Sequence, residues 1–69
     1  MYTLRITLHD GDQLVELRER RVTGWERAKK AFYNATYNNP GARVTLANAE
    51  GKVIRIGSHS KTEYSSNED

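Results

Sequence analysis

The chain has 69 residues, enough for one small domain, and a chain of this length buries only about 60% of the surface that it exposes when unfolded. It contains no cysteine, which excludes disulfides and thiolate metal sites and fits a reducing, cytoplasmic location. No apolar stretch approaches the roughly 18–20 residues of a membrane-spanning helix, and the N-terminus alternates apolar and polar residues, unlike a signal peptide. We therefore expect no membrane partner.

The net charge of +2 is unevenly distributed along the chain. Residues 1–57 contain ten Lys and Arg against six Asp and Glu, whereas residues 58–69 contain one Lys against three acidic residues. The second segment is polar and has almost nothing to bury, so we expect a disordered tail over 58–69 after a single domain over 1–57. The domain is then more basic than the whole chain.

The first predicted element is a hairpin. Residues 2–9 alternate apolar and polar side chains, which is typical of a half-buried strand. The Asp-Gly pair that follows predicts a two-residue turn, because both central residues of such a turn need a positive φ. This turn pairs Leu4 with Leu17 on the covered face and Arg5 with Glu16 on the other face.

A helix is predicted next. Thr23 and Glu26 have the spacing of a capping box, in which each side chain satisfies a free backbone N–H at the start of a helix. The helix should end before Pro40, which disfavours helical geometry in the preceding residue. Its apolar residues fall on one stripe that should pack on a sheet. They are Trp25, Ala28, Ala31, Phe32 and Ala35.

Two tyrosines of this helix lie outside the apolar stripe. Tyr33 and Tyr37 are one turn apart, on a flank beside Lys29 and Lys30. We expect the tyrosines to lie over the edge of the sheet with their hydroxyl groups in water. The alternative is an aromatic and basic strip that binds a partner.

A second hairpin follows the helix. Residues 42–46 alternate again, and Asn-Ala-Glu-Gly after them predicts a turn with its glycine in the left-handed conformation. This turn pairs Val44 with Ile56 and Leu46 with Ile54, all facing inward.

These elements predict an α+β domain of order ββαββ, with a four-stranded, mainly antiparallel sheet and one helix packed on one face. With strands numbered along the chain, order 2-1-3-4 is antiparallel throughout, and orders 2-1-4-3 and 1-2-3-4 stay open. One face of the sheet then faces water. Its expected residues are Thr3, Arg5, Thr7, Glu16, Arg18, Arg20, Arg43, Thr45 and Arg55, with Leu14 and Val53 as apolar exceptions.

Arginine dominates this open face, which indicates a binding surface, although a solvated sheet face is also often rich in arginine and threonine. Duplex nucleic acid is the first candidate partner, because arginine and threonine bind phosphates and arginine reads guanine edges. Single-stranded RNA suits the face less well, since no aromatic residues are expected there. The candidate binding residues are Arg5, Arg18, Arg20, Arg43 and Arg55, with Tyr33 and Tyr37 on the helix.

Two other partners are consistent with the sequence. An acidic protein surface is the first, as in the small cysteine-free proteins that phages and mobile elements use to bind or inhibit a host or regulatory protein. A second copy of the chain is the other, giving a weak homodimer through a strand edge or the helix side.

No arrangement of residues points to catalysis. The chain has no nucleophile pattern and no glycine-rich phosphate loop. His9, Asp10 and Asp12 could resemble metal ligands, but Asp-Gly-Asp is explained by turn chemistry and lacks the further ligands of a calcium loop. We therefore expect a non-enzymatic protein without a metal or cofactor.

Overall fold

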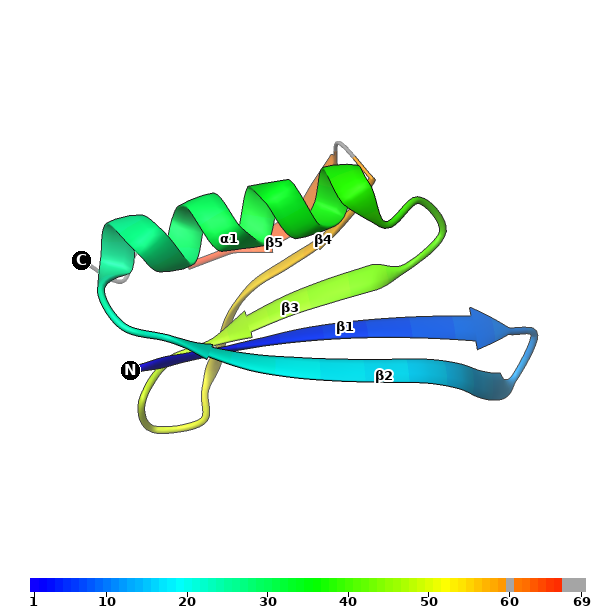
Figure 1. The fold of residues 1–69 in the computed structure, drawn as a ribbon, viewed down its shortest axis with the longest axis horizontal. Helices are drawn as coiled ribbons and strands as arrows, with labels where there is room; N and C mark the ends of the chain where they lie inside the picture. The colour runs from blue at the N-terminus through cyan, green and yellow to red at the C-terminus, as the bar shows by residue number, and fades with distance from the viewer. Residues whose placement is uncertain (60, 67–69) are drawn as a thin grey trace.

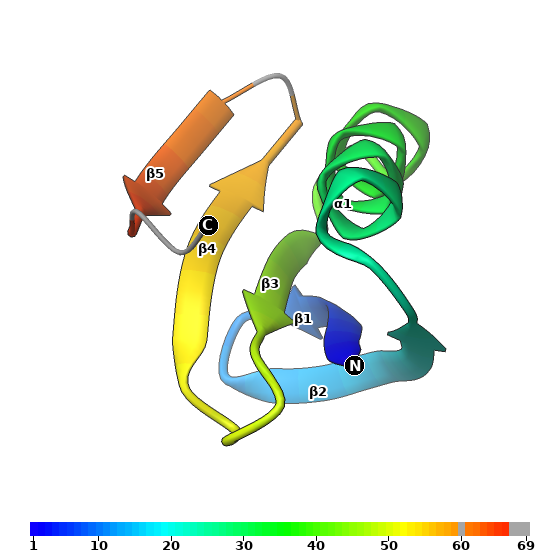
Figure 2. The same cartoon turned by 90° about the vertical axis from the view of Figure 1, so that its left-hand side faces the viewer.

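The computed structural model describes residues 1–59 and 61–66. They form β1 (Tyr2–Asp10), β2 (Gln13–Val22), α1 (Trp25–Asn38), β3 (Arg43–Ala47), β4 (Val53–Ser58) and β5 (Lys61–Ser65). The strands make one antiparallel sheet of order β2-β1-β3-β4-β5, and α1 packs on one face of it (Figures 1 and 2). The α+β class is thus confirmed, and the first four strands have the order 2-1-3-4, one of the three that the sequence left open. The sheet has five strands rather than the four predicted.

The additional strand, β5, lies in the segment predicted to be disordered. It pairs with β4, and Nη2 of Arg43 donates a hydrogen bond to Oε1 of Glu63 at 3.0 Å. A polar segment can form such a strand because an edge position supplies backbone hydrogen bonds without requiring buried side chains. The prediction of a disordered tail is wrong for Ser58, which ends β4, and for residues 61–65. Residues 60 and 67–69 of that predicted tail lie outside the described part of the chain.

The core lies between α1 and the covered face of the sheet. The apolar stripe predicted for the helix is confirmed, since three of its residues are buried and two are half-buried. The core cluster consists of Leu4, Val22, Ala28, Phe32, Ala35, Val44, Leu46 and Ile54. Strand β2 contributes only its last residue to this cluster.

The start of α1 differs from the prediction. Gly24, with φ +93°, is the N-cap residue, and no side chain caps the helix. The backbone N–H of Ala28 donates to the carbonyl oxygen of Gly24 at 3.0 Å, which closes the first turn. The capping box of Thr23 and Glu26 is therefore wrong. The predicted end is confirmed, because α1 stops at Asn38.

The register of the first hairpin is also different. Its loop consists of residues 11–12, and a bulge in the hairpin shifts the pairing further. Leu4 consequently pairs with Arg20 instead of Leu17, an offset of three residues. Val22, buried beside the start of the helix, anchors this register, whereas the other residues of β2 are exposed.

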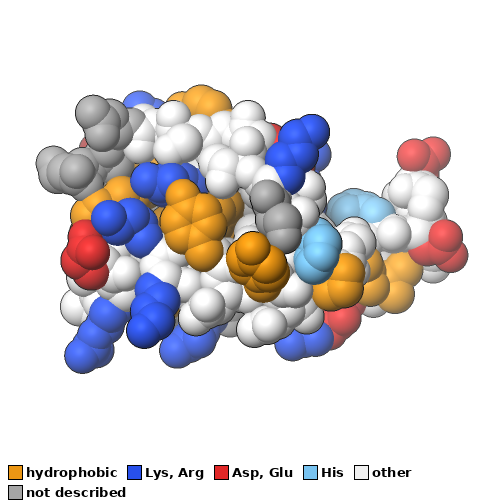
Figure 3. Space-filling view, turned by 90° about the horizontal axis from the view of Figure 1, so that it is seen from above, with side chains coloured by type: hydrophobic (Ala, Val, Ile, Leu, Met, Phe, Trp, Pro, Cys, Tyr) orange, Lys and Arg blue, Asp and Glu red, His pale blue; other side chains and the backbone are white. Residues whose placement is uncertain are grey.

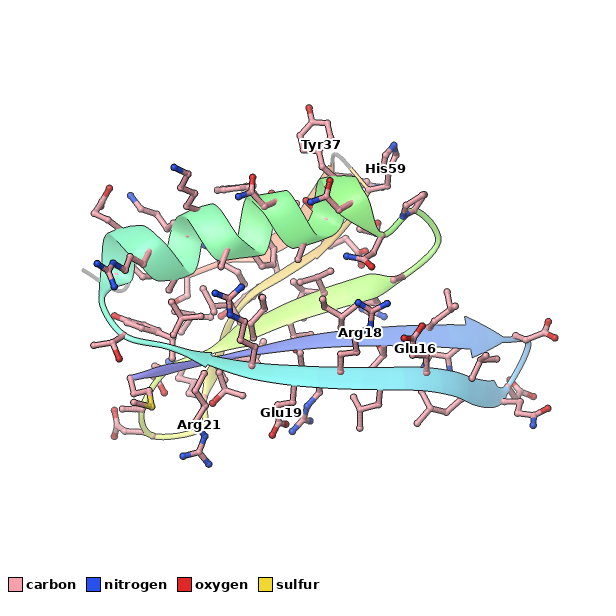
Figure 4. All side chains as sticks on the ribbon, in the orientation of Figure 1. Glu16, Arg18, Glu19, Arg21, Tyr37 and His59 are labelled. Carbon is pink, nitrogen blue, oxygen red and sulfur yellow. The ribbon has the colours of Figure 1, made fainter. Side chains whose placement is uncertain are left out.

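An odd offset exchanges the two faces of a strand. Glu16 and Arg18 consequently point to the helix side of β2, while Glu19 and Arg21 point to the open side (Figure 4). The predicted placement of Glu16, Arg18 and Arg20 on the open face is wrong.

The second hairpin is offset by one residue. Leu46 pairs with Arg55 instead of Ile54, and a bulge beside this pair keeps Ile54 in the core. Arg55 therefore lies on the helix side, where it contacts helix residues, and Ile56 lies on the open side. The predicted place of Arg55 on the open face is wrong as well.

Candidate functional site

The five arginines predicted to form one surface are divided between the two faces of the sheet. Arg5 and Arg43 are on the open face as predicted, but each binds a carboxylate there. Nη2 of Arg5 lies 2.7 Å from Oε2 of Glu19, and Nη2 of Arg43 lies 3.0 Å from Oε1 of Glu63. These two positive charges are compensated, whereas Arg21 on the same face has no ion pair among the described residues.

A groove separates α1 from β2 on the helix side of the sheet. It forms because this side of β2 carries Glu16, Arg18 and Arg20 before the buried Val22, so α1 packs mainly on the strands that supply apolar residues. Two adjoining hollows of about 340 and 440 Å³ make up the groove. They share Arg20, Ala31 and Asn34 as lining residues.

The floor of the groove is apolar and its walls are polar. Leu4, Ile6, Ala31 and Ala35 lie at the bottom, among residues that pack in or against the core. The wall formed by β2 contains Arg18, Glu19 and Arg20. The wall formed by α1 contains Arg27, Lys30, Asn34 and Asn38, whose helical spacing places them on one stripe.

The walls concentrate uncompensated positive charge. Among the described residues, no carboxylate forms an ion pair with Arg20, Arg27 or Lys30. Arg18 is different, because its Nε lies 2.7 Å from Oε2 of Glu16. Lys and Arg side chains gather around the helix in Figure 3, while acidic ones lie mainly toward the projecting end of the first hairpin. The hollow of about 440 Å³, lined by Arg20, Arg27 and Lys30, has no acidic residue among its described lining residues, whereas Glu19 lines the other hollow. A hollow lined by one sign of charge attracts ligands of the opposite sign.

The opposite flank of α1 holds Arg55 against aromatic rings. Its guanidinium carbon lies 5.2 Å from the ring centroid of Trp25 and 5.8 Å from that of Tyr33. Nη1 of Arg55 donates a hydrogen bond to the Tyr33 hydroxyl at 2.8 Å, so this hydroxyl is not simply in water as predicted. Tyr37 is 64% exposed and has its ring 6.0 Å from that of His59. Tyr33 thus packs against Arg55, and Tyr37 packs against His59.

Part of the groove lies outside the site predicted from the sequence. Arg27, Asn34 and Asn38 were not singled out, although their spacing with Lys30 on one side of a helix was available as a signal. Of the predicted arginines, the groove brings together only Arg18 and Arg20.

Neither a metal site nor a membrane span is found in the described chain. Within residues 1–59 and 61–66, no three His, Cys, Asp or Glu side chains are placed to hold a metal ion. No helix there is long and apolar enough to cross a membrane. Comparison with known protein families, with characterised proteins and with solved structures finds no match to this chain.

Proposed function

We propose that this protein is a non-enzymatic binding module for duplex nucleic acid, with a phosphate backbone lying along the groove between α1 and β2. One observation carries the proposal: Arg20, Arg27 and Lys30 line the same hollow, and none has a carboxylate partner in the described part of the chain. Arginine, lysine and asparagine are common phosphate-binding side chains. Asn34 and Asn38 continue this set along the helix.

A duplex fits this surface better than a single strand. Proteins that bind single strands usually stack bases on free aromatic faces. Among the described residues, no aromatic side chain lines either hollow of the groove, and the exposed Tyr37 lies on the opposite flank of α1 with its ring 6.0 Å from that of His59. Contacts to phosphates by the groove need no free aromatic face.

The proposal predicts a salt-dependent affinity that depends on the groove. We expect the double substitution Arg27→Gln and Lys30→Gln to weaken binding of a mixed-sequence DNA duplex. It should also reduce the slope of log affinity against log salt by about two, because each phosphate contact contributes about one counterion. Fluorescence anisotropy at several salt concentrations measures both quantities.

The double substitution Arg5→Gln and Arg43→Gln is the matched control. It removes the same charge from the open face, where both arginines are paired. We expect it to leave the slope nearly unchanged. Equal slopes for the groove variant and the wild-type protein, or equal losses in the two variants, would contradict the proposal.

An acidic protein segment is a second candidate for the same groove. The observation that favours it is the apolar floor, where Ile6 is half-buried beside Ala31 and Ala35. An amphipathic acidic segment could place apolar side chains on this floor and carboxylates against Arg20. No DNA binding even at low salt would make this candidate the better one.

A further inference from the structure

The free edge of β2 is a second surface of interest, separate from the groove. β2 spans ten residues at one end of the sheet, and all of them except Val22 are exposed. An edge strand presents unpaired backbone N–H and C=O groups that can bind another strand. The other edge strand, β5, has only five residues.

Apolar side chains accompany this free edge. Leu14, Val15 and Leu17 are 49%, 58% and 52% exposed. Leu17 pairs with Thr7 on the open face of the sheet. The hairpin extends well beyond the end of α1, as Figure 1 shows, so the helix covers none of its projecting part.

We propose that β2 binds β2 of a second copy of this chain, antiparallel and about a two-fold axis, so that two sheets join into one. Directly opposed residues of antiparallel strands lie on the same face. When the two-fold axis is normal to the joined sheet, one residue of β2 therefore lies opposite the same residue of the other copy. Both helices then lie on the same face of the joined sheet.

The charges of β2 identify that residue as Leu17. When Leu17 opposes Leu17, Glu16 of each copy opposes Arg18 of the other, which gives two opposite-charge pairs on the helix side. Within one chain, Nε of Arg18 already lies 2.7 Å from Oε2 of Glu16. The dimer therefore assembles four side chains of alternating charge on the helix side of the joined sheet and an apolar Leu17 contact on its open face.

A register about Val15 opposes Glu16 with Leu14 and so forms no opposite-charge pair beside the axis. The registers about the charged neighbours of Leu17 bring like charges together. If the axis passes beside Arg18, the Arg18 side chains of the two copies lie opposite each other. If it passes beside Glu16 or Glu19, two glutamates lie opposite each other. Like charges directly opposite each other destabilise a pair of strands. Since a single pair of strands makes a small interface, we expect a reversible dimer that forms as the protein concentration rises.

Sedimentation equilibrium of the full chain without nucleic acid tests the dimer. We expect the average mass of the wild-type protein to rise toward twice the monomer mass with concentration, and Leu17→Lys to abolish this rise. Val53→Lys is the control, because Val53 is also exposed on the open face but lies on an inner strand. Circular dichroism checks that each variant is folded. A wild-type protein that stays monomeric throughout overturns the proposal and leaves an extended peptide of another protein as the occupant of the edge.

Two further variants test the register. Glu16→Arg and Arg18→Glu should each weaken the dimer, and their combination should restore it, because the exchange keeps opposite charges opposed about Leu17. If the combination does not restore the dimer, the Leu17 register is wrong. The chain has no cysteine, so Leu17→Cys should also form a disulfide-linked dimer upon mild oxidation, whereas Val53→Cys should not.

Discussion

Gly57 is the residue that lets Phe32 approach the sheet. A Cβ atom at this position would lie 2.8 Å from Cζ of Phe32 and 2.9 Å from the carbonyl oxygen of Lys61. The ring is fully buried, and the carbonyl belongs to the backbone of β5, so neither can move away easily. Gly57 therefore faces the helix at a position that has no room for a Cβ atom.

We therefore expect Gly57→Ala to destabilise the protein by about 1–3 kcal/mol, the usual cost of overpacking a core. Urea denaturation measures the change. In a Phe32→Leu background, the same substitution should cost less, because the smaller side chain relieves part of the contact. An unchanged midpoint for Gly57→Ala in the wild-type background would mean that Phe32 does not lie against this residue.

The helix α1 can begin in one of two ways, with a side-chain cap from Thr23 or with the backbone conformation of Gly24. The capping box inferred from the sequence makes Thr23 important, whereas the structure has Gly24 at the N-cap with φ +93° and no side-chain cap. We expect Gly24→Ala to cost about 1 kcal/mol or more, since residues with a Cβ rarely adopt this conformation. Thr23→Ala should change the free energy of unfolding by less than about 0.5 kcal/mol.

Thermal denaturation of the two variants gives the comparison. A Thr23→Ala loss of about 1 kcal/mol with no loss for Gly24→Ala would instead support the capping box. Both substitutions lie at the turn from β2 into α1. They differ in what they change, because Thr23→Ala removes a possible side-chain cap and Gly24→Ala adds a Cβ atom at a residue with a positive φ.

The helix could be predicted from the sequence, but the register of β2 could not. The apolar stripe of α1 repeats at helical spacing over three turns, and burial of Ala28, Phe32 and Ala35 agrees with it. In β2, the exposed Val15 and Leu17 give the same alternation as a buried strand would. Periodicity identifies a strand but not which of its faces is covered, and Val22 alone anchors the observed pairing.

The predicted placement of the arginines on one face of the sheet was wrong for the same reason. An odd error in register moves every side chain of a strand to the other face. Arg18 and Arg20 moved in this way to the groove beside the helix, and Arg55 moved to the rings of Trp25 and Tyr33. The composition shows the excess of positive charge in residues 1–57. The face of the sheet on which each arginine lies depends on two bulges, which the sequence pattern does not predict.

At the scale of the whole molecule, β5 shows how a polar segment can belong to the fold. It completes the sheet beside β4, and Glu63 compensates the charge of Arg43 across the open face. Without β5, the backbone of β4 would become an exposed edge over the core residue Ile54. The strand therefore contributes through backbone pairing rather than through buried side chains.

We expect a chain that ends at Ser58 to lose at least about 1 kcal/mol of stability, because several backbone hydrogen bonds are lost together. A chain that ends at Ser66 is the control, since it keeps all of β5. Urea denaturation of both shortened chains and of the full chain gives the comparison. Equal midpoints for the chain ending at Ser58 and the full chain would mean that residues 61–65 behave as a tail, as their composition indicates. A lower midpoint only for the chain ending at Ser58 would assign the loss to the pairing of β5 with β4.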